Sequence, residues 1–194
     1  MKKMIVLAAL AACAAGAVQA QEGPWMVRAR ATHLGMENKD ATSLGLTVND
    51  KTIPEIDVSY FFSKNVAAEL VLTVPQKQDV YIGGAALGTF KHLPPTLLAQ
   101  YHFTNFNGFK PYVGAGVNYT KISSVQLGAG ATLDNHSWGV AYQAGVDIPL
   151  DKKWSLNLDV KKIYIKSNVY LSGVNNGSLQ LDPVAASVGL GYRF

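Results

Sequence analysis

Apolar and polar residues alternate one by one along this chain, and the alternation recurs in eight separate stretches. In the first stretch one face holds Trp25, Val27, Ala29 and Ala31, and the other holds Met26, Arg28, Arg30 and Thr32. Successive side chains of a β-strand point to opposite faces, whereas an α-helix repeats about every 3.6 residues. The pattern therefore predicts a chain of β-strands, each with one apolar face.

The eight predicted strands are distributed over a single domain. They cover residues 25–32, 55–62, 66–73, 96–103, 112–119, 138–148, 154–161 and 184–193. After residue 20, no stretch is apolar for the roughly 18 residues that a membrane-spanning helix needs. A tilted strand crosses a membrane with only about 9–11 residues and exposes alternate side chains to lipid. The lengths therefore exclude helical spans and are compatible with spanning strands.

Aromatic side chains lie near the ends of several apolar faces. They are Trp25, Tyr60, Phe62, Tyr101, Phe103, Tyr119, Trp138, Trp154 and Tyr192. Rings in these places are typical of the lipid headgroup boundary. The opposite faces carry charges and many glycines, which suit the narrow lumen of a small barrel better than the apolar core of a soluble sandwich. We therefore predict a transmembrane barrel.

The connections between the predicted strands alternate in length. Those at 63–65, 104–108 and 150–153 are short, whereas those at about 38–51, 75–90, 121–136 and 166–178 are long and rich in Gly, Asn, Ser and Thr. Bacterial barrels have short periplasmic turns and long extracellular loops. The predicted fold is therefore all-β: an eight-stranded antiparallel transmembrane β-barrel with both termini in the periplasm.

The N-terminus has the three parts of a secretory signal peptide. Lys2 and Lys3 are positive, residues 4–18 are uncharged and mostly apolar or small, and residues 18–20 form a small-x-small cleavage site. About 15 apolar residues are too few to span a bilayer. We predict that residues 1–20 are cleaved and that residues 21–194 form the barrel. The alternative is a lipoprotein signal, in which Cys13 would become the lipidated N-terminus.

The last predicted strand ends on an aromatic residue, Phe194. A terminal aromatic residue on the closing strand is what outer-membrane assembly machinery commonly recognises. Together with the signal peptide, this feature predicts a barrel in the outer membrane of a Gram-negative cell. The expected partners are outer-membrane lipid, lipopolysaccharide and the assembly machinery, which would bind the C-terminal strand.

The charge and the histidines argue against nucleic-acid binding and against catalysis. The net charge is +4, part of it from the signal lysines, and this is too weak to attract nucleic acid. His136 and Ser137 are neighbours that point to opposite strand faces, so they cannot act as a direct Ser/His pair. His33 and His102 are both expected in the lumen, but no HExxH motif or mature cysteine accompanies them. We expect neither an enzyme nor a metal or cofactor site.

Four segments resemble the OmpW family of small outer-membrane barrels. They are KHLPPTLLAQYHF (91–103), KPYVGAGVNYT (110–120), SWGVAYQAGVDIPLDKKW (137–154) and LDPVAASVGLGYRF (181–194). HLPPT and PYVGAG are specific to this family, and weaker similarity runs through residues 56–75. The family is related to alkane-uptake porins, so the resemblance implies a hydrophobic channel that opens to the outside and carries small hydrophobic solutes.

Three prolines mark a place where a solute could leave the barrel sideways. Pro75 ends the third predicted strand, and Pro94 and Pro95 begin the fourth, next to it in a hairpin. Proline has no amide hydrogen to donate, so this part of the wall is expected to be incompletely paired. We predict a lateral opening at Pro75, His92, Leu93, Pro94 and Pro95, with a structural hydrogen bond from His92. The alternative is that the prolines only end strands at a loop.

The lumen is expected to be apolar above and charged below. The candidate channel lining is Leu46, Ile53, Phe90, Leu98 and Ile163. The candidate charge network is Arg28, Arg30, Glu55, Asp57, Glu69 and Asp159. Buried charges need partners, so this network would plug the lower barrel against water and ions. Lys161 also points inward and counts against a purely apolar channel, and Lys162 beside it could bind lipopolysaccharide phosphates if it points outward.

Two functions remain open from the sequence. The first is an outer-membrane channel for passive uptake of small hydrophobic molecules, with exit into the outer leaflet near the three prolines. The second is a structural barrel whose extracellular loops act as an interaction or receptor surface. The channel requires a pocket below the loops, whereas the structural barrel predicts a lumen that is filled along its full height.

Overall fold

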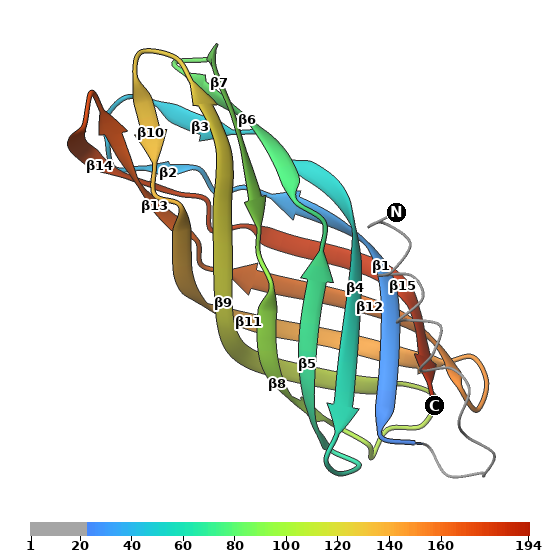
Figure 1. Cartoon of the computed structure of the whole chain (residues 1–194). Coiled ribbons are helices and arrows are strands. Elements are labelled where there is room, and N and C mark those ends of the chain that lie inside the picture. The colour runs from blue at the N-terminus through green and yellow to red at the C-terminus, as the bar shows by residue number, and fades with distance from the viewer. Residues whose placement is uncertain (1–22) are drawn as a thin grey trace, which may run out of the picture.

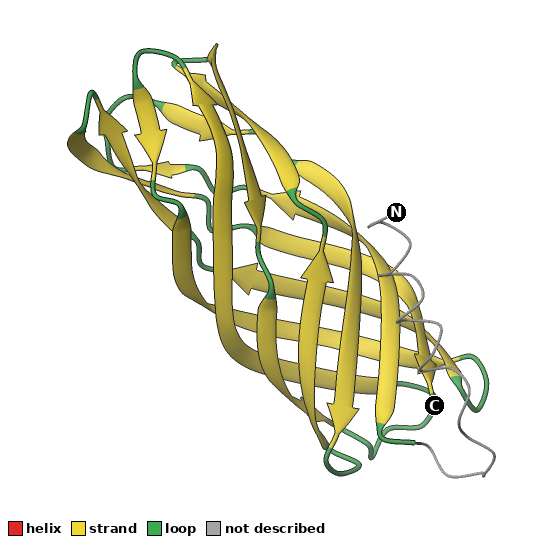
Figure 2. Ribbon diagram, in the orientation of Figure 1, coloured by secondary structure: helices red, strands yellow, loops and turns green. Residues whose placement is uncertain are grey.

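The structure is a computed structural model, and it describes residues 23–194. The predicted signal peptide, residues 1–20, lies outside the described residues. Strands and turns make up the described part of the chain, as Figure 1 and Figure 2 show. No helix in that part is long and apolar enough to cross a membrane.

Eight long strands close into a barrel. They are β1 (Trp25–Gly35), β4 (Lys51–Phe61), β5 (Val66–Thr73), β8 (Thr96–His102), β9 (Lys110–Leu127), β11 (His136–Pro149), β12 (Trp154–Ile163) and β15 (Val184–Arg193). They pair antiparallel in the order β11–β12–β15–β1–β4–β5–β8–β9, and β9 pairs with β11 to close the ring. The predicted eight-stranded antiparallel barrel is thereby confirmed. A closed ring leaves no open sheet edge, which the lipid interior would not tolerate.

The alternation in the sequence corresponds to the two surfaces of the barrel wall. In β1, the side chains of Met26, Arg28 and Arg30 are buried in the lumen, while the residues between them point outward. Outward apolar side chains are about half exposed, for example Leu97 at 52% and Val117 at 49%. A register shift of one residue would turn the charged face toward lipid, so the pattern fixes the register.

Aromatic rings mark both ends of the outer apolar surface. Near the short turns, Trp25 packs on Tyr60 with ring centroids 4.8 Å apart. At the opposite end of the wall, Tyr119 packs on Trp138, also at 4.8 Å. Membrane barrels carry such aromatic girdles at the two lipid–water interfaces. The wall between the two sets of rings is therefore the membrane-spanning part.

The long connections continue the wall as β-structure. The additional strands are β2 (Lys39–Asp40), β3 (Leu46–Val48), β6 (Gln76–Ile82), β7 (Ala85–Leu93), β10 (Ala131–Leu133), β13 (Lys166–Leu171) and β14 (Val174–Gln180). They extend the barrel beyond its upper end in Figure 1 and Figure 2. The regions expected as long loops, such as 75–90 and 166–178, are thus largely strand. The short turns lie where the sequence predicts them.

Two tight turns explain why these connections are ordered. Gly83 and Gly84 alone join β6 to β7, and Ser172 and Gly173 alone join β13 to β14. All four residues have positive φ, between 49° and 85°. Such residues form the type I′ turn, whose twist matches that of two paired strands. Each connection therefore folds back on itself and satisfies its backbone hydrogen bonds within a hairpin.

The longest strand, β9, joins the barrel to the extension. Its first half pairs with β8, from Tyr112 to Asn118, and its second half pairs with β7, from Lys121 to Leu127. Because β7 leads directly into β8 along the chain, the extension continues the wall of the barrel. The lumen of the barrel therefore continues into the space inside the extension.

Candidate functional site

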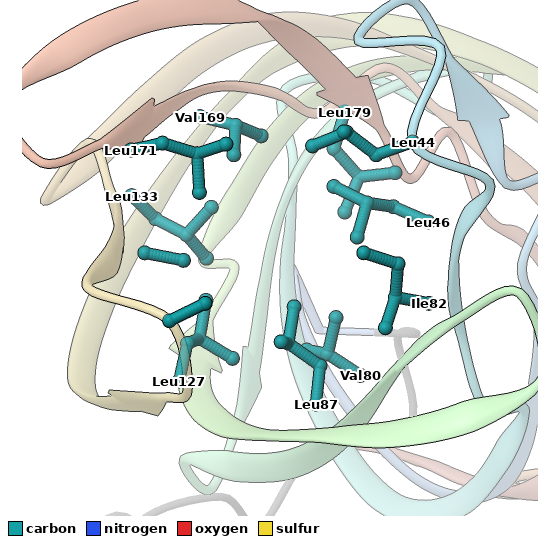
Figure 3. A pocket seen from close by; sticks show the side chains of 12 residues that line it. Leu44, Leu46, Val80, Ile82, Leu87, Leu127, Leu133, Val169, Leu171 and Leu179 are labelled. Carbon is teal, nitrogen blue, oxygen red and sulfur yellow. The ribbon is translucent and has the colours of Figure 1, made fainter.

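An apolar cavity of about 90 Å³ lies inside the extension, above the membrane-spanning part. Every side chain that lines it is apolar, and the lining includes Leu44, Leu46, Val80, Leu127, Val169 and Leu179. Figure 3 shows these side chains pointing toward one another from the surrounding strands and, for Leu44, from the segment before β3. Burial of apolar surface is favourable by about 25 cal/mol per Å². Such a lining favours an apolar guest over water.

A buried apolar cluster continues the cavity toward the membrane. Phe90, Leu98 and Ile163 belong to this cluster, and so does Leu46, which also lines the cavity. Ile53 lies apart from them, in a smaller cluster of three buried residues. Four of the five side chains named as candidate lining therefore lie in one cluster, although only Leu46 reaches the cavity itself.

Below the apolar cluster, Arg28 lies at the centre of a buried charge network. Its guanidinium lies 2.7 Å from Asp147, 3.1 Å from Asp57 and 3.4 Å from Glu69. Two of its nitrogens bind the two carboxylate oxygens of Asp147, which is the strongest geometry for such a pair. The Arg28 side chain is fully buried, so these partners replace the water that it loses.

Arg30 and Lys161 extend the network across the lumen. Arg30 lies 3.0 Å from Glu55 and 3.2 Å from Asp57, and Lys161 lies 2.9 Å from Glu55 and 2.7 Å from Asp159. All five side chains are buried. Separating buried ions from their partners is costly, so a solute cannot pass this level without a large penalty. The network closes the lumen.

Two members of the network, Asp147 and Lys161, are absent from the charge network predicted from the sequence. Asp147 is visible in the alternation as an inward residue of β11, but the pattern does not give its height in the barrel. Lys161 is also recognisable as inward, and its burial between Glu55 and Asp159 makes it part of the network instead of part of the channel.

A second cavity, of about 750 Å³, opens at the short-turn end of the barrel. Its lining includes Met26, His102 and Asp147 at the level of the charge network, and Lys64 and Lys153 near the turns. The network therefore lies between this vestibule, whose lining is mixed, and the apolar cluster above it.

Cross-strand pairing is interrupted where the barrel wall meets the extension. β5 pairs with β8 as far as Val71 opposite Thr96, and pairing between β6 and β7 begins at Gln76 opposite His92. The residues between these points, 72–75 on one side and 93–95 on the other, have no partner across the interruption. We call these two stretches the seam.

The three prolines named from the sequence all lie in the seam. Pro75 is exposed, Pro94 is buried and Pro95 is half-buried. The Pro95 carbonyl accepts a hydrogen bond from the Tyr119 amide of β9 at 3.1 Å. Leu93 remains paired with β9, opposite Lys121.

Side chains hydrogen-bond to carbonyl groups of the seam. Gln76 Nε2 donates to the Val74 oxygen at 2.7 Å, and Thr96 Oγ1 donates to the Pro94 oxygen at 3.2 Å. A buried carbonyl without a partner would cost about 1–3 kcal/mol. These two contacts avoid that cost without pairing the two sides of the seam with each other.

The model of one protein family, the OmpW family, matches residues 14–194. The chain belongs to the OmpW family. It is 40% identical to y4mB, an uncharacterized outer-membrane protein of Sinorhizobium fredii, over 91% of this chain and 82% of that one. It is 35% identical to outer membrane protein W of Escherichia coli over the full length of both. The predicted resemblance is confirmed, and the chain is an outer-membrane protein.

A solved structure supports the same assignment. The outer membrane protein OprG from Pseudomonas aeruginosa superposes with a TM-score of 0.77, at 25% identity, over 92% of this chain and 99% of that one. The OmpW-family barrel described above is therefore the fold that this sequence shares with its relatives.

The histidines of this OmpW-family barrel lie apart from one another. His102 is buried in the lumen and stacks on Tyr112 with ring centroids 4.9 Å apart. His33 is exposed on the outer surface and bonds to Thr52, so the expectation that it lines the lumen is wrong. In β1 the inward residues are those with even numbers. Within residues 23–194 no three or more metal-binding side chains come together.

Lys162 points outward in the OmpW-family barrel, but it is already engaged. Its amine lies 2.5 Å from Glu37 and donates to the Asp182 carbonyl. Hydrogen bonds from Lys162 and Lys39 lower the pKa of Glu37 to about 2. The carboxylate therefore stays ionised over the physiological range, and it is shared by Lys162 and Lys39. Its bonds to Glu37 and to the Asp182 carbonyl already engage the Lys162 amine, which leaves this lysine little capacity for lipid phosphates.

A glycine on the inward face gives the Arg30 side chain its space. A Cβ atom at Gly189 would lie 2.1 Å from the Ala29 carbonyl oxygen and 2.8 Å from Arg30 Cγ. We expect Gly189→Ala to lower the free energy of unfolding by about 1–3 kcal/mol, because the backbone and Arg30 must shift. Urea unfolding in lipid, followed by tryptophan fluorescence, measures this. In the control Gly35→Ala, the new Cβ approaches nothing closer than 3.8 Å, and equal losses in both variants would contradict the explanation.

Proposed function

We propose that this barrel takes up small hydrophobic molecules passively and releases them sideways into the outer leaflet through the seam. One observation carries the proposal: an apolar cavity and an apolar cluster lie above the seam, and buried ion pairs close the lumen below it. An apolar solute that enters from outside has a favourable site above and a barrier underneath. The seam lies between the two.

Entry begins at the apolar cavity of the extension. The cavity is small, at about 90 Å³, so a solute enters by displacing side chains such as Leu44 and Leu87 that are only partly buried. These side chains are flexible and apolar, and they can pack against a guest as they pack against each other. The apolar cluster beneath, with Phe90 and Leu98, continues the favourable surface toward the seam.

Exit through the seam avoids the charge network. Next to the seam the outer wall is apolar, and Leu72, Val74 and Leu97 are exposed by 42%, 55% and 52%. A solute that passes between the unpaired stretches therefore moves from an apolar lumen to the apolar interior of the bilayer. On this path the solute does not cross the buried charge network, and no hydrogen bonds between the two sides of the seam have to be broken.

The test is uptake of a labelled apolar solute. Liposomes containing the barrel are compared with liposomes containing no protein and with liposomes containing a barrel of similar size from another family. We expect faster uptake only with this protein. A rate equal to that of both controls would refute the proposal and favour the structural role, in which the extension acts as an interaction surface and the cavity has no solute.

We also propose that outward lysines beside the seam bind lipopolysaccharide phosphates. Lys77 and Lys91 are exposed and directly opposite each other on β6 and β7, and Lys121 lies diagonally from Lys91 on β9. Like charges in this arrangement destabilise a strand pair. None of the three forms a salt bridge with another described residue. Lys121 lies two residues from Tyr119, near the headgroup level, where phosphates would supply the missing negative charge.

Lipopolysaccharide should therefore stabilise this barrel through these lysines. We expect a rise in melting temperature when lipopolysaccharide replaces phosphatidylethanolamine, and we expect Lys77→Ser/Lys91→Ser/Lys121→Ser to lose most of it. Each lysine near an anionic lipid surface contributes about 1 kcal/mol. The control Lys64→Ser/Lys152→Ser/Lys153→Ser removes the same charge at the other end of the barrel. An undiminished response in the first variant would refute the assignment.

A further inference from the structure

A buried polar pair lies between the cavity and the seam. The side chains of Gln78 on β6 and His92 on β7 are both fully buried, and their Nε2 atoms lie 3.1 Å apart. The Phe90 ring packs edge-on to His92 at 6.0 Å, and Val80, two residues beyond Gln78, lines the cavity. The pair is therefore a polar point within an apolar passage.

Each member of the pair keeps one polar atom without a partner. Gln78 Oε1 and His92 Nδ1 are buried, and neither has a hydrogen-bond partner among residues 23–194. If Gln78 Nε2 donates to His92 Nε2, the neutral ring carries its proton on Nδ1, so one donor and one acceptor are unused. If the amide is turned over, its oxygen accepts from His92 Nε2–H instead, so Gln78 Nε2 becomes the unused donor and His92 Nδ1 the unused acceptor. The pair presents a donor and an acceptor together in either arrangement.

The position of the pair places it on the path of the solute. His92 is opposite Gln76, the residue that directly follows Pro75, and Leu93 begins the other side of the seam. Toward the extension, the next residue of β6 that points into the lumen after Gln78 is Val80, which lines the cavity. A molecule that moves from the cavity to the seam therefore has to pass Gln78 and His92.

We propose that Gln78 and His92 form a hydrogen-bonding subsite for the polar group of an amphipathic solute. The chemical class that fits is a small apolar molecule with one hydroxyl group, because a hydroxyl group both donates and accepts a hydrogen bond. A pure hydrocarbon would leave both atoms unpaired. This inference rests on the proposed uptake function and adds a preference to it. One neutral hydrogen bond changes affinity by up to about tenfold.

Binding is tested without transport by nitrogen NMR of the full mature barrel in lipid, with ¹⁵N-labelled histidine. The probes are 1-octanol and octane, which differ in one hydroxyl group. The His92 signals are assigned by their loss in His92→Phe. We expect 1-octanol to shift the imidazole resonances of His92, and we expect octane not to shift them. No shift with saturating 1-octanol, or the same shift with both probes, would overturn the subsite.

Preference is tested by the ratio of 1-octanol to octane uptake into liposomes, each corrected for protein-free liposomes. We expect Gln78→Leu and His92→Phe to lower this ratio by about three- to tenfold, and we expect His92→Gln, which keeps a donor and an acceptor, to retain much of it. The control is Thr120→Val, because Thr120 is a buried polar residue whose hydroxyl already donates to Asn118 at 2.7 Å. Heat-dependent gel mobility shows whether each variant is folded.

The outcomes separate this inference from the proposed function. If the wild-type barrel takes up neither probe, the uptake function fails, and the NMR titration still decides whether the subsite binds an alcohol. If both probes are taken up and Gln78→Leu leaves their ratio unchanged, the uptake function stands and the subsite is wrong. In that case the pair only joins β6 to β7, and its loss changes the melting temperature alone.

Discussion

Replacing Arg28 with methionine is expected to lower the free energy of unfolding of the barrel by about 3–5 kcal/mol, because it leaves buried carboxylates without their cation. Arg28 lies within 3.4 Å of Asp57, Glu69 and Asp147, and it is fully buried. Methionine fills much of the same volume, so the loss reports the charge and not a cavity. Urea unfolding in lipid bilayers, followed by tryptophan fluorescence and gel mobility, measures the change.

The matched control for this variant is Lys64→Met. It removes the same charge from an exposed position at a short turn, where we expect a change within about 0.5 kcal/mol. The double variant Arg28→Met/Asp147→Asn should recover part of the loss, since one of the unpaired carboxylates is then neutral. A loss below about 1 kcal/mol for Arg28→Met would mean that water reaches the network, and the lumen would then not be closed at this level.

Restoring amide donors to the seam is expected to slow uptake of an apolar solute by about tenfold or more, because each new cross-strand hydrogen bond adds about 1 kcal/mol to the cost of opening. The variant is Pro75→Val/Pro94→Val, in which a β-branched residue replaces proline on each side of the seam. The initial rate of uptake into liposomes gives the size of the effect. Slow hydrogen exchange at the new amides would show that they have paired.

The control for the seam variant is Pro111→Val. Pro111 also lacks an amide donor, but it lies within β9, paired opposite Val146 at the short-turn end. We expect its uptake rate to equal that of the wild type. If the seam variant is folded, shows protected amides and still transports at the wild-type rate, the solute does not leave by the seam and the prolines only end strands.

The spanning strands could be predicted from the sequence because lipid and lumen impose opposite requirements on alternate residues. Within a strand, alternate residues face the lumen and the lipid, so the position of Arg28 or Leu97 in the alternation is enough to assign its environment. The assignment does not require the residues on the neighbouring strands to be known. The inward location of Arg28, Glu55 and Asp57 follows directly. The same rule accounts for His33, whose odd number in β1 places its side chain on the outer surface.

The arrangement of the candidate site could not be predicted, because parity does not give height. The height of a residue along the barrel axis depends on how far each strand is displaced against the next. This displacement brings Asp147 to Arg28 and keeps Ile53 away from Phe90. The β-structure of the extension could not be predicted for another reason. Segments rich in glycine and serine are typical of loops, whereas Gly83 and Ser172 occupy tight turns inside hairpins. No sequence pattern identifies Gln76 and Thr96 as the residues that hydrogen-bond to the seam carbonyls.

Lateral release is tested most directly by where an apolar fluorescent solute arrives first. Liposomes with lipopolysaccharide in the outer leaflet carry the barrel with its extension outward, and they contain a quencher either on the lipid acyl chains or enclosed in the internal water. We expect the protein to accelerate quenching by the lipid-bound quencher above the protein-free rate, before any quenching from inside. Earlier quenching by the enclosed quencher would show passage straight through the barrel, and it would contradict both the closed charge network and exit at the seam.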